Sequence, residues 1–369
     1  MQVIKAKTMY TGKRVLKNAH VAFDRTIRTV STGEPARVDT SFDVITPAFI
    51  DPHNHIGIHR LFDSWGESNE HMDSMLLLAD ILDSVQMDDP AFRRAIENGV
   101  LYSCVVPGSA NLIGGRSAVI RHYGRDTNDA LVARAGIKAA LGYNLVNRKD
   151  WGGARPSTRM GGVALLRKRL RKTQTEIKKS RPKLDEEDTV LADVLRGRTR
   201  LRVHAHTRDD IAALLRIVDE FALNVSVEHA MNVTDAAVYR ELKKRGIPVT
   251  YGPLGSRPAK LELKDAGWFN IPALLESGVR FGLMTDHPVI AIWDLFLCTR
   301  WFLRAGMTRQ QAIELVTREN AALLGIGRQL GTIERGKWAS MIGWRGDPFA
   351  LDSRPVAVYA EGRDLLEDE

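Results

Sequence analysis

The stretch that decides the fold is VITPAFIDPHNH, residues 44–55, an apolar run that ends in His53 and His55. Side chains at positions i and i+2 of a β-strand point to the same face, because the backbone is pleated. A strand that ends in this way can present two imidazole nitrogens to one metal ion. A His-x-His pair alone also occurs by chance in loops and cores, so its weight depends on the rest of the chain.

Three more apolar runs end in residues that can ligate a metal. LRVHAH (201–206) ends in His204 and His206, VSVEH (225–229) ends in His229, and FGLMTD (281–286) ends in Asp286. Each of these residues by itself is more often a hydrogen-bonded interior side chain or a helix cap than a ligand. Their joint occurrence, each at the end of an apolar run, predicts a metal hydrolase.

Strand-like and helix-like segments alternate through this part of the chain. Strands are expected at 201–206, 224–229, 247–251 and 279–286, and helices at 209–221, 234–245 and 271–277. Strands separated by helices pair in parallel through right-handed crossovers, and barrel enzymes place their chemistry at the carboxyl ends of such strands. The pattern predicts an α/β fold, a (β/α)8 TIM barrel over residues 47–329.

The two ends of the chain have a different pattern from the middle. Residues 1–46 and 330–369 hold short β-prone runs separated by turn residues such as Gly336, Gly346 and Pro348. Two β-rich ends around a barrel predict a small composite β-sandwich formed by both termini.

Composition narrows the class of protein. The 369 residues are 44% apolar. The net charge of the chain is +8, and one basic segment, residues 167–183, has the same net charge by itself, so the rest of the chain is balanced. Such a segment without aromatic residues is typical of a solvated helix face, with an anionic partner or a charged peptide as the alternative, and no nucleic-acid-binding module is visible. No run approaches the roughly 18 apolar residues of a membrane span, and no signal peptide is visible. Cys104 and Cys298 are expected to be buried thiols, so a cytoplasmic protein is predicted.

The candidate ligands suit zinc or a similar divalent ion, which would make a bound water acidic enough to ionise near neutral pH. The predicted metal ligands are His53, His55, His204, His229 and Asp286. His204 and His206 share one strand face; we favour His204 as the ligand and assign His206 a catalytic or substrate contact. Asp286 is placed to accept the proton of the attacking water and to pass it to the departing nitrogen.

The order of these motifs, FIDPHNH, then HAH, EH and TDHP, resembles the amidohydrolase superfamily. It is most similar to the branch of imidazolonepropionase and the metal-dependent Xaa-Pro or Xaa-Arg dipeptidases. The tail GTIERGK (331–337) supports the resemblance. The resemblance implies a (β/α)8 barrel with a composite β-sandwich, four histidine ligands, and Asp286 as both ligand and proton shuttle.

One departure from the family bears on the number of ions. Two-metal relatives carry a carboxylated lysine or a glutamate at an earlier strand end, and this branch has Gly-Glu-Asn where the chain has Gly142-Tyr143-Asn144. A phenol stays neutral near pH 7 and does not bridge two cations as a carboxylate does. The sequence therefore predicts one Zn²⁺ per chain.

Basic side chains in the predicted loops indicate a substrate with a carboxylate, which guanidinium groups bind at two points. These loop residues are Arg60, Arg116, Arg148, Arg155, Arg159, Arg257 and Lys260. The predicted substrate-binding residues are Arg116, Tyr143, Arg159, Arg257 and His287.

The predicted function is hydrolysis of an amide bond in a peptide-like or modified-peptide substrate. The resemblance implies, as one reaction of this type, the removal of a follower peptide in natural-product maturation. A cyclic-amide hydrolase or deaminase of a small molecule and a metal-poor binding protein are the alternatives. A homo-oligomer is left open.

Overall fold

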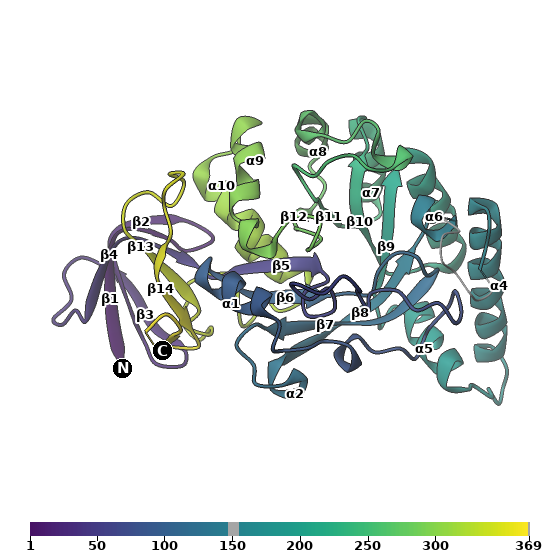
Figure 1. The fold of residues 1–369 in the computed structure, drawn as a ribbon, viewed down its shortest axis with the longest axis horizontal. Helices are drawn as coiled ribbons and strands as arrows, with labels where there is room; N and C mark the ends of the chain where they lie inside the picture. The colour runs from purple at the N-terminus through teal and green to yellow at the C-terminus, as the bar shows by residue number, and fades with distance from the viewer. Residues whose placement is uncertain (147–154, 368–369) are drawn as a thin grey trace.

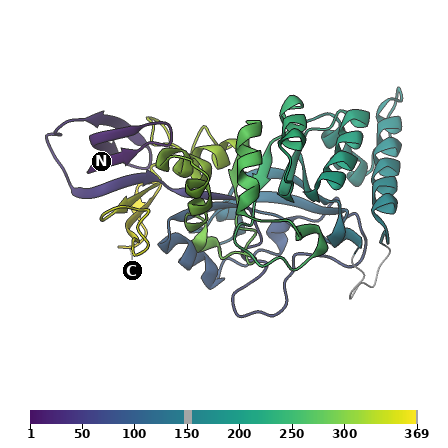
Figure 2. The ribbon, with the colours of Figure 1, turned by 90° about the horizontal axis from the view of Figure 1, so that it is seen from above.

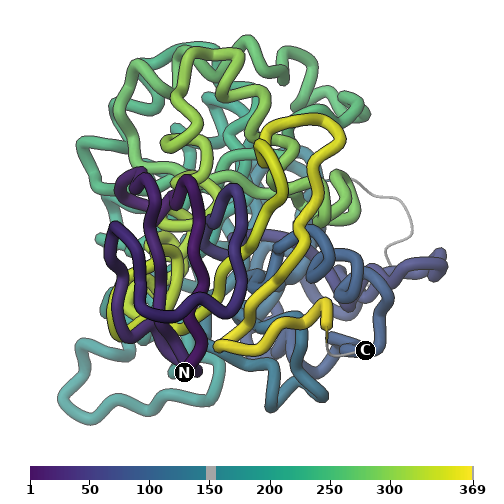
Figure 3. The backbone as a smooth tube through the Cα atoms, turned by 90° about the vertical axis from the view of Figure 1, so that its left-hand side faces the viewer, coloured from purple at the N-terminus to yellow at the C-terminus, as the bar shows by residue number. Residues whose placement is uncertain are grey.

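The computed structural model describes residues 1–146 and 155–367, which form two sheets with helices around the larger one (Figure 1). Both ends of the chain build the smaller sheet, in the order β15-β14-β13-β4-β1-β2-β3. Its strands are β1 (Gln2–Tyr10), β2 (Val15–Phe23), β3 (Ile27–Thr32), β4 (Thr40–Pro47), β13 (Met341–Trp344), β14 (Pro355–Ala360) and β15 (Arg363–Asp364). The N-terminal and C-terminal segments lie side by side in Figure 3, because β4 pairs with both β1 and β13.

The smaller sheet has an apolar core of its own. Phe23 and Tyr359, from opposite ends of the chain, meet edge to face with ring centroids 5.3 Å apart. The expectation that both termini contribute to one β unit is confirmed by the strand order. A two-layer sandwich, and the boundaries at residues 46 and 330, stay predictions.

The larger sheet holds eight strands in sequence order and is a nearly closed barrel. Its strands are β5 (Phe49–Asn54), β6 (Val100–Val105), β7 (Ile113–Arg121), β8 (Leu131–Ala140), β9 (Leu201–Thr207), β10 (Val225–Asn232), β11 (Val249–Tyr251) and β12 (Phe281–Leu283). The chain after β12 returns to β5, where the Asp286 N–H donates to the His53 carbonyl at 3.1 Å. The Asn320 amide bridges the same gap by donating to the carbonyls of Ile50 and Leu283.

One strand departs from an all-parallel (β/α)8 barrel. β7 runs antiparallel to both β6 and β8, whereas the other neighbouring pairs are parallel. Only residues 106–112 join β6 to β7, and a parallel connection needs a crossover of a dozen residues or more. The short connection therefore reverses the direction of the chain.

Helices pack around the barrel (Figures 1 and 2). They are α1 (Pro90–Glu97), α2 (Thr127–Ala130), α3 (Tyr143–Val146), α4 (Arg159–Ile177), α5 (Glu186–Leu195), α6 (Arg208–Phe221), α7 (Ala236–Lys244), α8 (Ile271–Ser277), α9 (Arg300–Arg304), α10 (Arg309–Glu314) and α11 (Asn320–Leu323). The expected helices at 209–221, 234–245 and 271–277 correspond to α6, α7 and α8. Thr207 caps α6 by accepting from the Asp210 N–H, which fixes the helix directly after β9.

The basic segment 167–183 lies mostly on α4 and is paired with acids on its neighbours. Arg167 and Arg171 both bind Glu220 of α6, at 2.5 Å each, and Arg169 binds Asp188 of α5. These pairs hold α4 against the outer helices and neutralise part of its charge. Across the described ranges, no helix combines the length and apolarity needed to cross a membrane.

Candidate metal centre

The end of β5 presents His53 and His55 to the mouth of the barrel. The Nδ1 atom of His53 lies 2.7 Å from Glu228 Oε2, and Nδ1 of His55 lies 2.8 Å from the Val106 carbonyl. Because both acceptors take the Nδ1–H, each ring keeps its Nε2 lone pair for the interior of the site. Both Nε2 atoms face Asp286 Oδ1, at 3.5 Å from His53 and 3.3 Å from His55.

Asp286 and His229 hold backbone conformations that side chains rarely adopt. Their φ angles are 54° and 82°, in the left-handed region that favours glycine. Nδ1 of His229 lies 3.0 Å from the Gly252 carbonyl, so its Nε2 is directed inward as well. Strain of this kind is kept where the surrounding structure over-determines it, and it is common at functional sites.

His204 and His206 lie at the end of β9, and their rings contact that of His229. The ring centroids of His204 and His229 are 4.3 Å apart, and those of His206 and His229 are 4.5 Å apart. Among the described residues, both ring nitrogens of His204 and Nδ1 of His206 are buried without a hydrogen-bond partner. Buried polar atoms without partners are costly, and metal coordination would satisfy them.

Ligand atoms of two groups of three side chains converge closely enough to hold a metal ion. One group is His53, His229 and Asp286, and the other is His204, His206 and His229, with the ligand atoms of each group within 4.8 Å of one another. The site therefore fits a divalent metal by its donor atoms, their convergence and their unpaired nitrogens. The sequence predicted His53, His55, His204, His229 and Asp286 as ligands, whereas it assigned His206 a catalytic or substrate contact.

The electrostatics of the site favour neutral imidazoles, the form that ligates metals. Burial lowers the pKa of His53 and of His206 to about 4, and it lowers the pKa of His204 and His229 well below the usual value. Burial alone would raise the pKa of Asp286, but the nearby histidines outweigh burial and hold that pKa well below its usual range.

Lys138 is a residue of the site that sequence reasoning missed. It lies on β8, is 1% exposed, and has its Nζ 3.4 Å from His53 Nε2 and 3.0 Å from the Pro107 carbonyl. Burial lowers its pKa to about 8. The one available signal was a lysine inside the apolar run Ile137–Leu141 near a strand end.

Glu228 and Arg202 form a buried support behind His53. The Arg202 guanidinium donates to Glu228 Oε2 at 3.1 Å and to the Pro52 carbonyl at 2.6 Å. The Ser226 hydroxyl donates to the other oxygen of Glu228 at 2.6 Å. Burial alone would raise the pKa of Glu228, but Arg202 and His53 lower it by more than burial raises it. The carboxylate therefore stays ionised and orients the His53 ring.

A cavity of about 510 Å³ opens beside the candidate metal ligands. His55, His204, His206, His229 and Asp286 line its floor, and Lys138, Arg155, Arg257 and Lys260 also line it. Arg155 donates to the backbone carbonyls of Asn144 and Leu145, which fixes its position on the wall. The predicted Arg257 thus lies with the histidines, in a cavity with more basic than acidic side chains.

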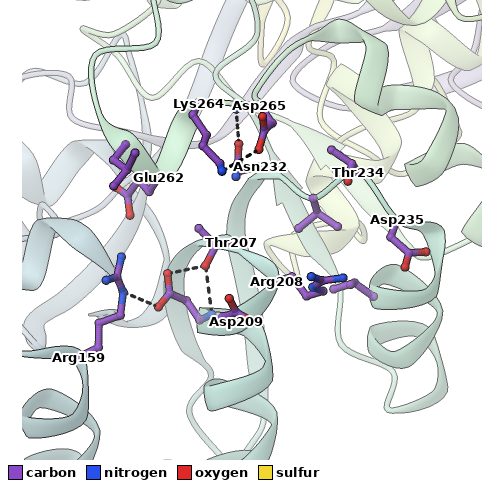
Figure 4. Close-up of a pocket in the computed structure, with 14 residues that line it drawn as sticks. Arg159, Thr207, Arg208, Asp209, Asn232, Thr234, Asp235, Glu262, Lys264 and Asp265 are labelled. Atoms are coloured by element: carbon purple, nitrogen blue, oxygen red, sulfur yellow. Dashed lines mark hydrogen bonds and ion pairs between the residues drawn. The ribbon is translucent and has the colours of Figure 1, made fainter.

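The structure places the other predicted substrate residues elsewhere. Arg116 lies on β7 and lines a separate cavity, and Arg159 pairs with Asp210 at 3.0 Å in a neighbouring cavity of about 490 Å³ (Figure 4). His287 is buried beside the site, where its Nδ1 accepts from the Ile292 N–H. Tyr143 begins α3, and its backbone N–H donates to Glu262.

The remaining basic loop residues do not change this picture. Arg60 pairs with Asp88 at the surface. Arg148 lies outside the described residues.

Histidines and an aspartate at one edge of a nearly closed barrel define a barrel enzyme with a site that could hold a metal. Three comparisons narrow this class. The model of the Amidohydrolase family matches residues 153–364. The chain is 30% identical to the amidohydrolase from Thermotoga maritima MSB8, with a TM-score of 0.91 over 99% of each chain.

Two further relatives are more distant. Amidohydrolase tasK of Hapsidospora irregularis is 26% identical over 88% of this chain, which spans 36% of that protein's length. A Xaa-Pro dipeptidase with bound methionine is 16% identical, with a TM-score of 0.63 over 98% of this chain and 99% of its own, and shows the fold alone.

The chain belongs to the amidohydrolase family. It is a hydrolase that acts on carbon–nitrogen bonds, which confirms the predicted enzyme class.

Proposed function

We propose that this protein is a metal-dependent hydrolase that cuts an amide bond in a peptide-like substrate bearing a carboxylate near the scissile bond. The observation that carries the proposal is the convergence of two groups of metal-ligating side chains beside a basic cavity. One group is His53, His229 and Asp286, with His55 3.3 Å from Asp286, and the other is His204, His206 and His229. Removal of a follower peptide from a modified peptide is one reaction of this type.

A bound divalent ion would supply an acidified water and polarise the substrate carbonyl. Asp286 takes the proton of the attacking water on a carboxylate oxygen, 3.3 Å from His55 Nε2. It then delivers that proton to the amide nitrogen as the C–N bond breaks, which lets the amine leave as a neutral group. Glu228 keeps the His53 ring oriented throughout, because it binds Nδ1, the ring nitrogen that faces away from Asp286.

The position of Lys138 supports a second ion. The sequence prediction of one Zn²⁺ assumed that nothing replaced the missing acid at Tyr143, but Lys138 Nζ lies 3.4 Å from His53 Nε2, in the cavity that His204 and His229 also line. In two-metal relatives a carboxylated lysine bridges the ions. We therefore propose two ion positions in place of one, the first at His53, His55 and Asp286, and the second at His204 and His229.

The basic cavity supports a substrate with a carboxylate. Arg257 and Lys260 follow β11 and line the opening above the histidines, so a carboxylate bound there would lie close to the predicted ions. A guanidinium and an ammonium bind carboxylates through charge-assisted hydrogen bonds. A small neutral amide would leave these groups without a partner.

The test is a panel of peptides that share a sequence and end in either a carboxylate or an amide. Mass spectrometry of the products identifies the bond that is cut, and the Asp286→Asn variant is the inactive control. We expect turnover of the carboxylate series with a lower KM than the amide series. Turnover confined to cyclic amides or amino-purines would contradict the proposal and favour the small-molecule alternative.

A further inference from the structure

Glu262 is a buried acid beside the metal centre with no part in the function described so far. It lies in a short 3-10 helix, Leu261–Leu263, in the loop after β11, and is 3% exposed. Figure 4 shows it on the wall of the neighbouring cavity, with Arg159 below it in this view. Its carboxylate thus separates that cavity from the histidines.

The two oxygens of Glu262 have different surroundings. Oε2 accepts the backbone N–H of Tyr143 at 3.0 Å. Oε1 is buried without a hydrogen-bond partner in the described part of the chain, and it lies 3.7 Å from Nε2 of His204. That nitrogen is also buried and unpartnered, so an unsatisfied carboxylate oxygen faces an unsatisfied imidazole nitrogen.

This pairing would be expensive without a third group between the two atoms. An unpaired buried acceptor costs about 1–3 kcal/mol, and more when it is charged. Zinc binds imidazole nitrogen at about 2.0–2.1 Å and carboxylate oxygen at about 2.0–2.2 Å. Two such ligands of one ion can therefore lie 3.7 Å apart, as His204 Nε2 and Glu262 Oε1 do.

Two donors near Glu262 pair with Asp210 instead. Arg159 donates to Asp210 at 3.0 Å, and the Thr207 hydroxyl donates to the second oxygen of Asp210 at 2.7 Å. The loop therefore places Glu262 Oε1 close to His204, with no hydrogen-bond donor bound to it among the described residues.

We propose that Glu262 is a carboxylate ligand of the ion held by His204. The loop after β11 thereby supplies, from a distant part of the sequence, a carboxylate near position 143 that adds to the part proposed for Lys138. The contact between Glu262 and the Tyr143 backbone places this carboxylate next to that position in space. The inference rests on the proposed function, because it needs the second ion position.

The test compares zinc binding by Glu262→Gln with that by Asp265→Asn, which removes an exposed acid from the same loop. Chelator competition gives the affinity for each zinc equivalent, and the visible spectrum of the Co²⁺-loaded protein reports the ligand set. We expect Glu262→Gln to lose the weaker equivalent or to bind it at least about tenfold less tightly, with a changed Co²⁺ spectrum. The control should bind as the wild type does.

Two results would overturn the inference: unchanged zinc affinity and Co²⁺ spectrum in Glu262→Gln, or an equal loss in both variants. If Glu262→Gln does not fold, Glu262→Asp keeps the charge on a shorter arm, and a partial loss of affinity supports the ligand role while no loss overturns it. A wild-type protein that binds no zinc would instead refute the proposed function itself.

Discussion

Two sets of buried histidines in this barrel differ in what their ring nitrogens contact. His122 is 3% exposed, with Nδ1 2.8 Å from the Val100 carbonyl and Nε2 2.8 Å from the Ser103 hydroxyl. His204 is as deeply buried, yet neither of its nitrogens has a partner among the described residues. Burial does not distinguish a structural histidine from a ligand; the unsatisfied nitrogen does.

The largest effect should come from the proton shuttle. Asp286→Asn keeps the shape of the side chain but removes the base, so we expect kcat to fall by about 10³-fold or more. The thermal midpoint of the metal-free protein should change little. Steady-state kinetics on a cleaved peptide, with metal content measured beside it, checks this prediction. Activity within a few-fold of the wild type would place the base elsewhere.

Acid should destabilise the metal-free protein through the site histidines. Burial holds the pKa of His53, His206 and His287 near 4 in the folded state, below the value of about 6.5 in the unfolded chain. Between these values the unfolded chain binds more protons, so the free energy of unfolding should fall as the pH drops from about 6.5 to about 4. The loss is about 1.4 kcal/mol per pH unit for each histidine. Urea unfolding across this range measures it, and a flat profile would contradict it.

His122 gives the matched control for the metal histidines. His122→Phe removes two hydrogen bonds and leaves the Ser103 hydroxyl without its partner, which should cost about 1–3 kcal/mol of unfolding free energy. Metal content and kcat should stay at wild-type values. A loss of metal in this variant would break the distinction between the two sets of histidines.

The smallest effect should come from the cations of the cavity. Lys260→Ala should raise KM about tenfold for a peptide ending in a carboxylate, and much less for the same peptide ending in an amide. Lys264→Ala is the control, because Lys264 is exposed and lies 3.9 Å from Asp265 in the neighbouring cavity. Equal effects on both peptides would show that Lys260 does not bind the carboxylate.

The features that the sequence revealed are local ones. His53, His204 and His229 each end an apolar run, so periodicity alone placed them at strand ends, and helices α6 to α8 follow from apolar spacing. The reversed direction of β7 depends on the length of one connection, which periodicity does not report. Arg159 was predicted to bind substrate because it is a basic residue in a predicted loop. Its ion pair with Asp210 forms only in the folded chain, so the sequence did not reveal it.

Lys138 and Glu262 show most clearly which site residues a single sequence does not reveal. Lys138 is one charged residue in an apolar strand, and only the closed barrel brings its Nζ to His53. Glu262 comes from a loop without regular pattern, and its relation to His204 depends on how that loop folds over the barrel. Such long-range contacts carry no signature in a single sequence.

The most direct test of the account is the metal content per chain of the purified protein, measured by mass spectrometry after loosely bound ions are removed. The two proposed positions predict about two equivalents of zinc or a similar ion in the wild type, with the first equivalent lost or weakened in His53→Ala and the second in His204→Ala. One equivalent would contradict the second position. A chain that stays empty when offered metal would contradict the metal mechanism altogether.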